Sequence, residues 1–431
     1  MSGLALYRGF TRIGMPMARL LLRRRLAKGK EDAARIGERE GIASLTRPEG
    51  PVAWLHAASV GEAQSALILI EKLLSENREL RILVTTGTVT SASYLKDRLP
   101  NRAFHQYLPL DCPQWVNRFL NHWKPDIAIW MESEFWPNLI VETKRRDIPA
   151  LLVNARMSAN SLRAWQRMNG MAKYLISGFR LCLAQTEYQA ELLQKFGAMN
   201  VSCVGNLKYS AAPLAVVEQD LEALQSEIGI RPVWVAASTH AGEEVLASNA
   251  HTALLADIPE LLTIIVPRHP SRAANIETTL SQRGHNCIRR STGKRIELDT
   301  AIYIADTLGE LGLFYRLARI SYIGGSMSHH GGHNPLEAAQ LGCAVIHGPD
   351  MDNFSSVAAA LASSHGSVVV GTAQELAHAI RELFEDREFL VGQTARAAAV
   401  AETNRGVVDS VYAAIAPAVH EALRGGGIAG S

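Results

Sequence analysis

The chain from residue 51 onward alternates short apolar runs with longer amphipathic stretches. The short runs are predicted to be buried strands, and the stretches with apolar residues three or four positions apart are predicted to be helices. This alternation is typical of a parallel sheet covered by helices. In the first half the predicted strands are 52–57, 81–86, 126–131, 150–154, 181–184 and 201–204, with helices such as 66–74, 138–144 and 189–196 between them.

The alternation pauses at residues 208–213 and then resumes. Two Rossmann-like domains, 31–210 and 211–420, account for the pattern, as the length of 431 residues also suggests. Neither has a GxGxxG turn after its first strand, which is the usual mark of an NAD or FAD site. A glycine-rich tail at 421–431 is predicted to be flexible. The second set of predicted strands is 233–237, 262–266, 301–304, 320–323, 344–347 and 367–370.

The N-terminal segment, residues 1–30, is basic and amphipathic. It contains eight lysines and arginines and no acidic residue. One face carries apolar residues at helical spacing, Pro16 is predicted to kink the helix, and the basic cluster from Arg23 to Lys30 would attract anionic lipid. We therefore expect a membrane-surface segment, with a solvated basic arm or a helix docked on its own protein as the alternatives. The apolar face consists of Leu6, Phe10, Ile13, Met17 and Leu20.

Composition argues against a zinc or disulfide protein and against a transmembrane protein. The net charge of +2 hides a mildly acidic remainder once the basic segment is set aside. Five cysteines form no CxxC pair, so zinc or a disulfide framework is not expected and a reducing compartment fits best. No uncharged apolar window is long enough for a clean transmembrane helix, and no signal-peptide pattern is evident.

Candidate chemistry in the first domain follows predicted strands. The segment WLHAASVGE ends at Glu62, where Gly61 would permit a tight turn and the carboxylate would open a helix. Such a carboxylate can accept a proton from a hydroxyl group, although acidic residues are also common in first turns for stability alone.

Two more glutamates, Glu132 and Glu134, alternate with apolar residues after another predicted strand and are expected to face one side. Lys208, after the last strand of this domain, can pair with one of them or face a developing negative charge.

In the second domain, Arg268 emerges at a strand end, where a guanidinium can grip a phosphate or form an interdomain salt bridge. The sequence from Gly324 to Glu337 is rich in glycine and histidine. Asn334, Pro335 and Glu337 fit a helix-capping pattern, and the glycines are expected to leave the helix N-terminus open for an anion. Three nearby histidines, 329, 330 and 333, suggest a metal site, but no acidic or cysteine ligand joins them at a recurring spacing.

These segments resemble the Kdo transferases of lipopolysaccharide synthesis, which transfer 3-deoxy-D-manno-octulosonic acid (Kdo) from CMP-Kdo to a lipid A precursor. The resemblance covers roughly residues 50–350 and keeps the family order of the motifs. The motifs are HAASVGE, MESEFWPNLI, NARMS, GNLKY, ASTHAGEE, VPRHP and GGHNPLEAAQLG.

The resemblance implies a GT-B fold, an α/β architecture of two Rossmann-like domains with a cleft between them. It further implies inversion at the anomeric carbon, no metal or other cofactor, and an acceptor domain followed by a CMP-sugar donor domain. Glu62 would be the general base, Glu132 and Lys208 would support the transition state, and Ser59, Gly61 and Glu134 would shape the pocket. The implied CMP site comprises Arg268, His269, Gly309, Glu310, Leu311, Asn334, Pro335, Leu336 and Glu337.

The implied partners are CMP-Kdo, a lipid A precursor of the lipid IVA type and an anionic membrane surface, with no nucleic acid. The expected location is the cytoplasmic face of the bacterial inner membrane. Two features depart from the family pattern, namely the histidine-rich loop at 328–330 and an N-terminal segment more interrupted by arginine than an apolar anchor. A sugar-nucleotide epimerase or hydrolase, and a non-catalytic membrane-associated binding module, are the alternatives on the same scaffold.

Overall fold

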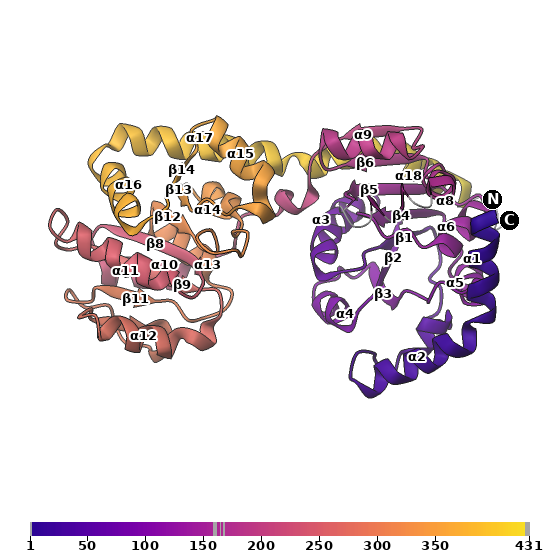
Figure 1. Cartoon of the computed structure of the whole chain (residues 1–431), viewed down its shortest axis with the longest axis horizontal. Helices are drawn as coiled ribbons and strands as arrows, with labels where there is room; N and C mark the ends of the chain where they lie inside the picture. The colour runs from indigo at the N-terminus through magenta and orange to yellow at the C-terminus, as the bar shows by residue number, and fades with distance from the viewer. Residues whose placement is uncertain (1, 158–161, 164, 167–168, 427–431) are drawn as a thin grey trace. The chain divides into compact units, whose positions relative to one another are not determined.

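The computed structural model describes the chain except residues 1, 158–161, 164, 167–168 and 427–431. The chain forms two compact units (Figure 1). The first comprises Met1–Ala211 with Gly406–Ser431, and the second is Ala212–Arg405. Each unit is built around one seven-stranded sheet, so the predicted pair of Rossmann-like domains is confirmed.

The first sheet is wholly parallel and has the order β3-β2-β1-β4-β5-β6-β7. Its strands are β1 (Val52–His56), β2 (Arg81–Thr86), β3 (Ala103–Tyr107), β4 (Ile127–Met131), β5 (Ala150–Ala155), β6 (Leu181–Ala184) and β7 (Val201–Cys203). Its helices are α1 (Ser2–Ile13), α2 (Met15–Ala27), η1 (Ile36–Glu40), α3 (Val60–Glu76), α4 (Val89–Lys96), α5 (Pro113–Trp123), α6 (Pro137–Lys144), α8 (Asn169–Ile176), α9 (Glu187–Lys195), η2 (Leu207–Ser210) and α18 (Val407–Gly426).

Both faces of this sheet are buried because alternate strand residues enter different cores. Trp54 and Trp130 pack in one core with an edge-on ring contact. Leu55 and Ile129 belong to the other. Near-continuous apolar strands are the sequence signature of this arrangement.

The second sheet is also parallel and has the order β10-β11-β9-β8-β12-β13-β14. Its strands are β8 (Val233–Thr239), β9 (Leu262–Pro267), β10 (Cys287–Arg289), β11 (Ile302–Ile304), β12 (Ile320–Ile323), β13 (Ala344–His347) and β14 (Ser367–Val369). Its helices are α10 (Glu218–Ile228), α11 (Glu243–Leu254), η3 (Pro270–Arg272), α12 (Ala273–Ser281), η4 (Arg290–Thr292), α13 (Leu311–Leu317), α14 (Pro335–Gln340), η5 (Asp352–Phe354), α15 (Ser355–Ser363), α16 (Ala373–Glu385) and α17 (Arg387–Arg405).

All twelve predicted strands are present, but the sequence pattern missed β3 and β10. Both are edge strands, which pair on one side only. The sequence of β3 is AFHQY, and β10 has three residues, none of them fully buried. Edge strands can be less apolar because one side of the ladder is open, and in these two strands the hydrophobic pattern was too weak to reveal them.

The end of the chain differs from the predicted boundary. We expected residues up to 420 to remain in the second domain, but the chain returns to the first unit after Arg405. The reason is the apolar face of α18, where Val411, Ile415 and Val419 are fully buried in the same core as Leu69 of α3. Residues 421–426, predicted to be a flexible tail, continue this helix, whereas 427–431 lie outside the described residues.

The N-terminal helices α1 and α2 meet at Gly14, with Pro16 in the first turn of α2, so the break falls two residues before the proline. One side of α1 is docked on the first unit. The Tyr7 hydroxyl donates to Asp111 at 3.0 Å, and Arg8 pairs with Glu142 at 2.6 Å. The predicted apolar stripe is exposed, with Leu6, Phe10, Ile13 and Met17 each more than 70% accessible. The segment is thus both docked and apolar on its outer face.

Some of the basic residues in this segment are engaged by the protein itself. Arg19 pairs with Glu40 and Arg25 pairs with Glu31, each at 2.7 Å. Other cations are exposed, namely Arg12, Arg23, Arg24, Lys28 and Lys30. In the part of the chain that the structure describes, no helix is long and apolar enough to span a bilayer.

Candidate functional site

The residues singled out from the sequence follow strands whose carboxyl ends share one edge of their sheet. In open parallel sheets, ligands bind at this edge where the strand order reverses. The reversal in the first sheet lies between β1 and β4, and that in the second lies between β8 and β12. Glu62 and Glu132 follow β1 and β4, while His240 and the glycine-rich loop follow β8 and β12. Each unit therefore presents a candidate site at its switch point.

Glu62 is the third residue of α3 and its side chain is buried. Its backbone N–H donates to the Ser59 hydroxyl at 3.2 Å, and that hydroxyl donates to Glu62 Oε1 at 3.1 Å. The Ala58 N–H donates to Oε2 at 2.8 Å. The predicted first-turn position is confirmed, but Gly61 lies inside the helix and makes no tight turn.

The electrostatic setting of Glu62 favours its protonated form. Its pKa is raised from 4.5 to about 7, chiefly by burial and also by the negative charges of Glu132 and Glu134, while the two hydrogen bonds oppose the shift. A carboxylate has about four acceptor positions, of which the capping contacts occupy two. Glu62 can therefore hold its loop and still receive a proton near neutral pH.

Glu132 and Glu134 do not continue the strand alternation expected of them. Strand β4 ends at Met131, and Glu132 has a left-handed backbone with φ of 55°. Such a conformation is uncommon outside glycine, asparagine and aspartate, and it re-aims the side chain at the end of the strand. Burial raises the pKa of both carboxyl groups.

The positive charge of Arg156 opposes the shift at Glu132 most strongly, followed by that of Lys208. Lys208 was expected as a partner, but Arg156, which directly follows β5, was missed. It belongs to the NARMS motif, whose last residue, Ser158, lies outside the described residues. The position of Arg156 one residue after a strand was the signal available in the sequence.

Lys208 is exposed and lies in η2, and the two residues before this turn, Gly205 and Asn206, fix its backbone. Asn206 caps this turn by accepting the Lys208 N–H at 3.0 Å. Gly205 has φ of 94°, and a Cβ there would lie 2.7 Å from Val407 of α18. Glycine is required because the returning helix packs directly against the backbone.

In the second unit, Arg268 and His269 follow β9 and are exposed at the carboxyl edge. Glu310, by contrast, is already engaged: it accepts from Arg290 at 2.9 Å, which holds its pKa below the usual range. Gly309 is exposed, with φ of 86°, and Leu311 begins α13.

The capping pattern at Asn334 is confirmed. Its side chain accepts the Leu336 N–H at 3.1 Å and donates to Glu337 at 3.2 Å, and Pro335 begins α14. The helix has only six residues, so its partial charge is small. The expected open N-terminus is thus partly closed by Asn334 itself.

The glycines before this helix serve close packing. A Cβ at Gly332 would lie 2.3 Å from the sulfur of Met351, and one at Gly331 would lie 2.6 Å from Asn353. These glycines let the loop after β12 pack against the segment after β13.

Glu243, at the start of α11, fixes the beginning of that loop. Its buried carboxylate accepts hydrogen bonds from the backbone N–H groups of Gly325, Ser326 and Met327, at 2.7, 3.1 and 3.2 Å. It also accepts from the Tyr322 hydroxyl and from the N–H of His240. Successive N–H groups in a turn make an anion-binding concavity, and here an internal carboxylate fills it.

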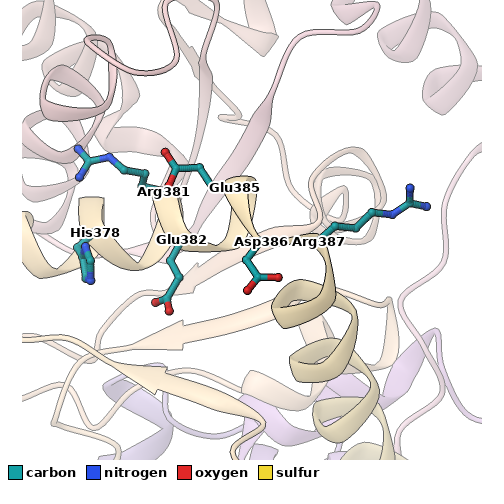
Figure 2. A pocket seen from close by; sticks show the side chains of 6 residues that line it. All are labelled: His378, Arg381, Glu382, Glu385, Asp386 and Arg387. Carbon is teal, nitrogen blue, oxygen red and sulfur yellow. The ribbon is translucent and has the colours of Figure 1, made fainter.

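Polar side chains also surround a depression at the end of α16. Figure 2 shows that they project in different directions and do not converge on one point. Arg381 is paired with Asp257 at 2.6 Å, and no strand-end loop contributes to the lining. We therefore do not place the candidate site here. The lining residues are His378, Arg381, Glu382, Glu385, Asp386 and Arg387.

Among the described residues, no group of three or more histidine, cysteine, aspartate or glutamate side chains has the arrangement of a metal site. Of the histidines considered as ligands, His330 and His333 instead contact His240, as described below.

Proteins similar to this chain along most of its length are Kdo transferases. The 3-deoxy-D-manno-octulosonic acid transferase of Rickettsia bellii is 34% identical over 86% of this chain and 88% of that protein. The transferase of the same name from Haemophilus influenzae is 36% identical over 82% of this chain and 84% of that protein. The chain belongs to the Kdo transferase family. Residues 34–211 match the family described as 3-Deoxy-D-manno-octulosonic-acid transferase (kdotransferase).

The fold of this Kdo transferase family member is GT-B, as expected. A glycosyltransferase from Rickettsia africae superposes with a TM-score of 0.58 over 87% of this chain and 99% of that one, at 12% identity. Likeness at this identity concerns the fold alone.

Proposed function

We propose that the chain transfers Kdo from CMP-Kdo to a lipid A precursor, with inversion at the anomeric carbon and with Glu62 as the general base. The observation that carries the proposal is the identity to the Rickettsia bellii Kdo transferase along 86% of the chain. Glu62 lies in the part that matches the family profile. Its buried carboxyl group, with a pKa of about 7, suits proton acceptance from a sugar hydroxyl near neutral pH.

The roles proposed for the remaining residues of the first unit follow from charge. As the donor bond breaks, the sugar gains positive character, and a carboxylate such as Glu132 stabilises positive charge nearby. Lys208 and Arg156 balance that carboxylate. Ser59 holds the turn before Glu62 through its hydrogen bond to that carboxylate, and Gly61 and Glu134 are proposed to shape the pocket.

The second unit is proposed to hold CMP. Its phosphate takes up negative charge as it leaves, and Arg268 offers an exposed guanidinium at the carboxyl edge of the sheet. The segment Asn334 to Glu337 supplies polar groups for the ribose, and the turn at Gly309 to Leu311 completes the site. No metal is assigned to the reaction in this proposal, because Arg268 can stabilise the leaving group.

The N-terminal helices are proposed to bring the enzyme to the cytoplasmic face of the bacterial inner membrane, where the lipid acceptor resides. The exposed apolar stripe supports this proposal, together with the exposed cations beside it. Each basic residue near an anionic surface contributes about 1 kcal/mol. Because α1 is docked on the first unit, membrane binding would also fix the position of that unit.

The test is release of CMP by purified enzyme supplied with CMP-Kdo and a lipid A precursor. Wild type should release CMP only with acceptor present. Glu62→Gln should lose at least about 100-fold in turnover while retaining CMP affinity, since general bases contribute about 10²–10⁴-fold. Glu71→Gln, an exposed change on the same helix, is the matched control.

Two outcomes would overturn the proposal. Near-normal turnover of Glu62→Gln would remove the base assignment. Donor turnover by wild type without any acceptor would favour the epimerase or hydrolase alternative.

A further inference from the structure

Four histidines from three loops meet at the switch point of the second sheet. His240 follows β8, His269 follows β9, and His330 and His333 lie in the loop after β12. Strands β8 and β12 are neighbours, and the strand order reverses between them. A ligand that binds at the usual place in this sheet would therefore meet the imidazole rings.

The rings are arranged as a stack around one hydrogen bond. The Nε2 atoms of His240 and His333 are 2.9 Å apart, and the two rings are inclined by only 8°. His330 stacks on His240 with ring centroids 3.9 Å apart. His269 approaches His240 edge-on at 5.9 Å.

The side chains that face this cluster are mostly basic. Arg268 and His269 face it from the loop after β9, and His330 faces it from the same loop as His333. The carboxylate of Glu243 acts on His240 in the opposite direction, but it is already committed to five hydrogen-bond donors. Burial, together with the positive charge of Arg268, lowers the pKa of His333 to about 4 and lowers that of His240 as well. Without a ligand the pair is neutral at pH 7.

The contact between the two Nε2 atoms limits how many protons the pair can hold. When both rings are neutral, one Nε2–H donates to the bare Nε2 of the other. One further proton can bind the free Nδ1 of the donor ring and leave that hydrogen bond intact. A second proton would set two N–H groups against each other. The pair can therefore accept one proton, and a nearby anion would favour that uptake.

We propose that His240, His330 and His333 form a binding subsite for the phosphate of the donor nucleotide, and that the subsite takes up one proton when the phosphate binds. The inference rests on the proposed function, since it assumes a CMP-linked donor. It adds His240, His330 and His333 to the nucleotide site and makes donor affinity dependent on pH.

The experiment measures the dissociation constant of the purified full-length protein for CMP between pH 7 and 8.5, in buffer with EDTA. Over this range the phosphate is almost fully dianionic, because its second pKa is about 6. Uptake of one proton predicts that the constant rises by up to about tenfold per pH unit. The probe has a phosphate and lacks the sugar carboxylate, so the phosphate alone must produce the effect.

Matched variants assign the effect to the cluster. His240→Asn should weaken CMP binding and abolish the pH dependence. His329→Asn changes the exposed neighbour in the same loop, which makes none of these ring contacts, and should behave as wild type. Should His240→Asn fail to fold, as judged by circular dichroism, the exposed His330→Asn takes its place and should reduce the slope.

The outcomes separate this inference from the proposed function. Absence of CMP binding at any pH would defeat both. Binding that is independent of pH, or dependent on pH only with CMP-Kdo, would overturn the phosphate subsite and leave the proposed function standing. Equal pH dependence in His240→Asn and wild type would also overturn it. So would a pH dependence that appears only when EDTA is left out of the buffer, because a metal would then be responsible.

Discussion

The raised pKa of Glu62 predicts how both turnover and stability change with pH. If Glu62 is the base, turnover requires its ionised form. With a pKa of about 7, roughly 9% of the carboxyl is ionised at pH 6 and roughly 91% at pH 8. Turnover at saturating CMP-Kdo and acceptor should therefore rise about tenfold between these values. An ordinary glutamate would be almost fully ionised at both and would give a flat profile.

The same shift has a cost in folding free energy, whose sign follows from linkage. Between about pH 4.5 and 7 the folded protein holds the Glu62 proton more tightly than the unfolded chain does, so stability falls as pH rises through this window. The shift in pKa from 4.5 to about 7 destabilises the folded protein at pH 8 by at most about 3 kcal/mol. Glu62→Gln keeps an acceptor for the Ala58 N–H and removes the buried charge.

The assay pairs turnover from pH 6 to 8 with urea unfolding at pH 5 and pH 8. Glu62→Gln should be inactive at every pH, and at pH 8 it should unfold at a higher urea concentration than wild type. Its advantage should shrink at pH 5, where wild-type Glu62 is protonated. A flat turnover profile in wild type, or a variant that is less stable at pH 8, would refute the reasoning.

Three further predictions concern packing and surfaces. Gly205→Ala should lower stability by about 2 kcal/mol because its Cβ would meet Val407. Gly293→Ala, at a left-handed glycine with no atom within 4 Å, should cost only the backbone strain of about 1 kcal/mol, and equal urea midpoints for the two variants would contradict the packing. Glu243→Gln should destabilise the second unit by about 2 kcal/mol, since a neutral amide cannot accept from all five donors. If its urea midpoint matched that of the exposed control Glu382→Gln, Glu243 would not have this structural role. Replacing Leu6, Phe10 and Ile13 together by serine should reduce sedimentation of the protein with anionic vesicles at least tenfold. Serine at the exposed Leu298 and Leu308, far from α1 in sequence, should leave sedimentation unchanged. Unchanged sedimentation of the first variant would refute membrane contact through α1.

The core of each sheet could be predicted from the sequence because buried parallel strands are apolar along their whole length. Central strands such as β4 and β12 follow this rule, while the edge strand β3 contains histidine and glutamine and does not. Local pattern also identified the cap at Asn334, since this cap depends on residues only two or three positions apart.

Features made by residues distant in sequence could not be predicted in this way. The contact of His240 with His333 spans 93 positions, and the return of α18 to α3 spans more than 300. The left-handed backbone at Glu132 was equally hidden, because glutamate has no preference for that conformation. The resemblance to a family located the strand-end residues, and the structure added their neighbours.

The return of α18 means that the second unit is inserted into the first. During synthesis, residues 1–211 emerge long before the helix that completes their core, while the second unit is finished by Arg405. The ribosome adds about 5–20 residues per second, so the unfinished core of the first unit must wait for roughly ten seconds or more with the apolar face of α3 uncovered. A stop codon near residue 405 would therefore damage the unit that carries Glu62 and spare the one that carries the histidine cluster.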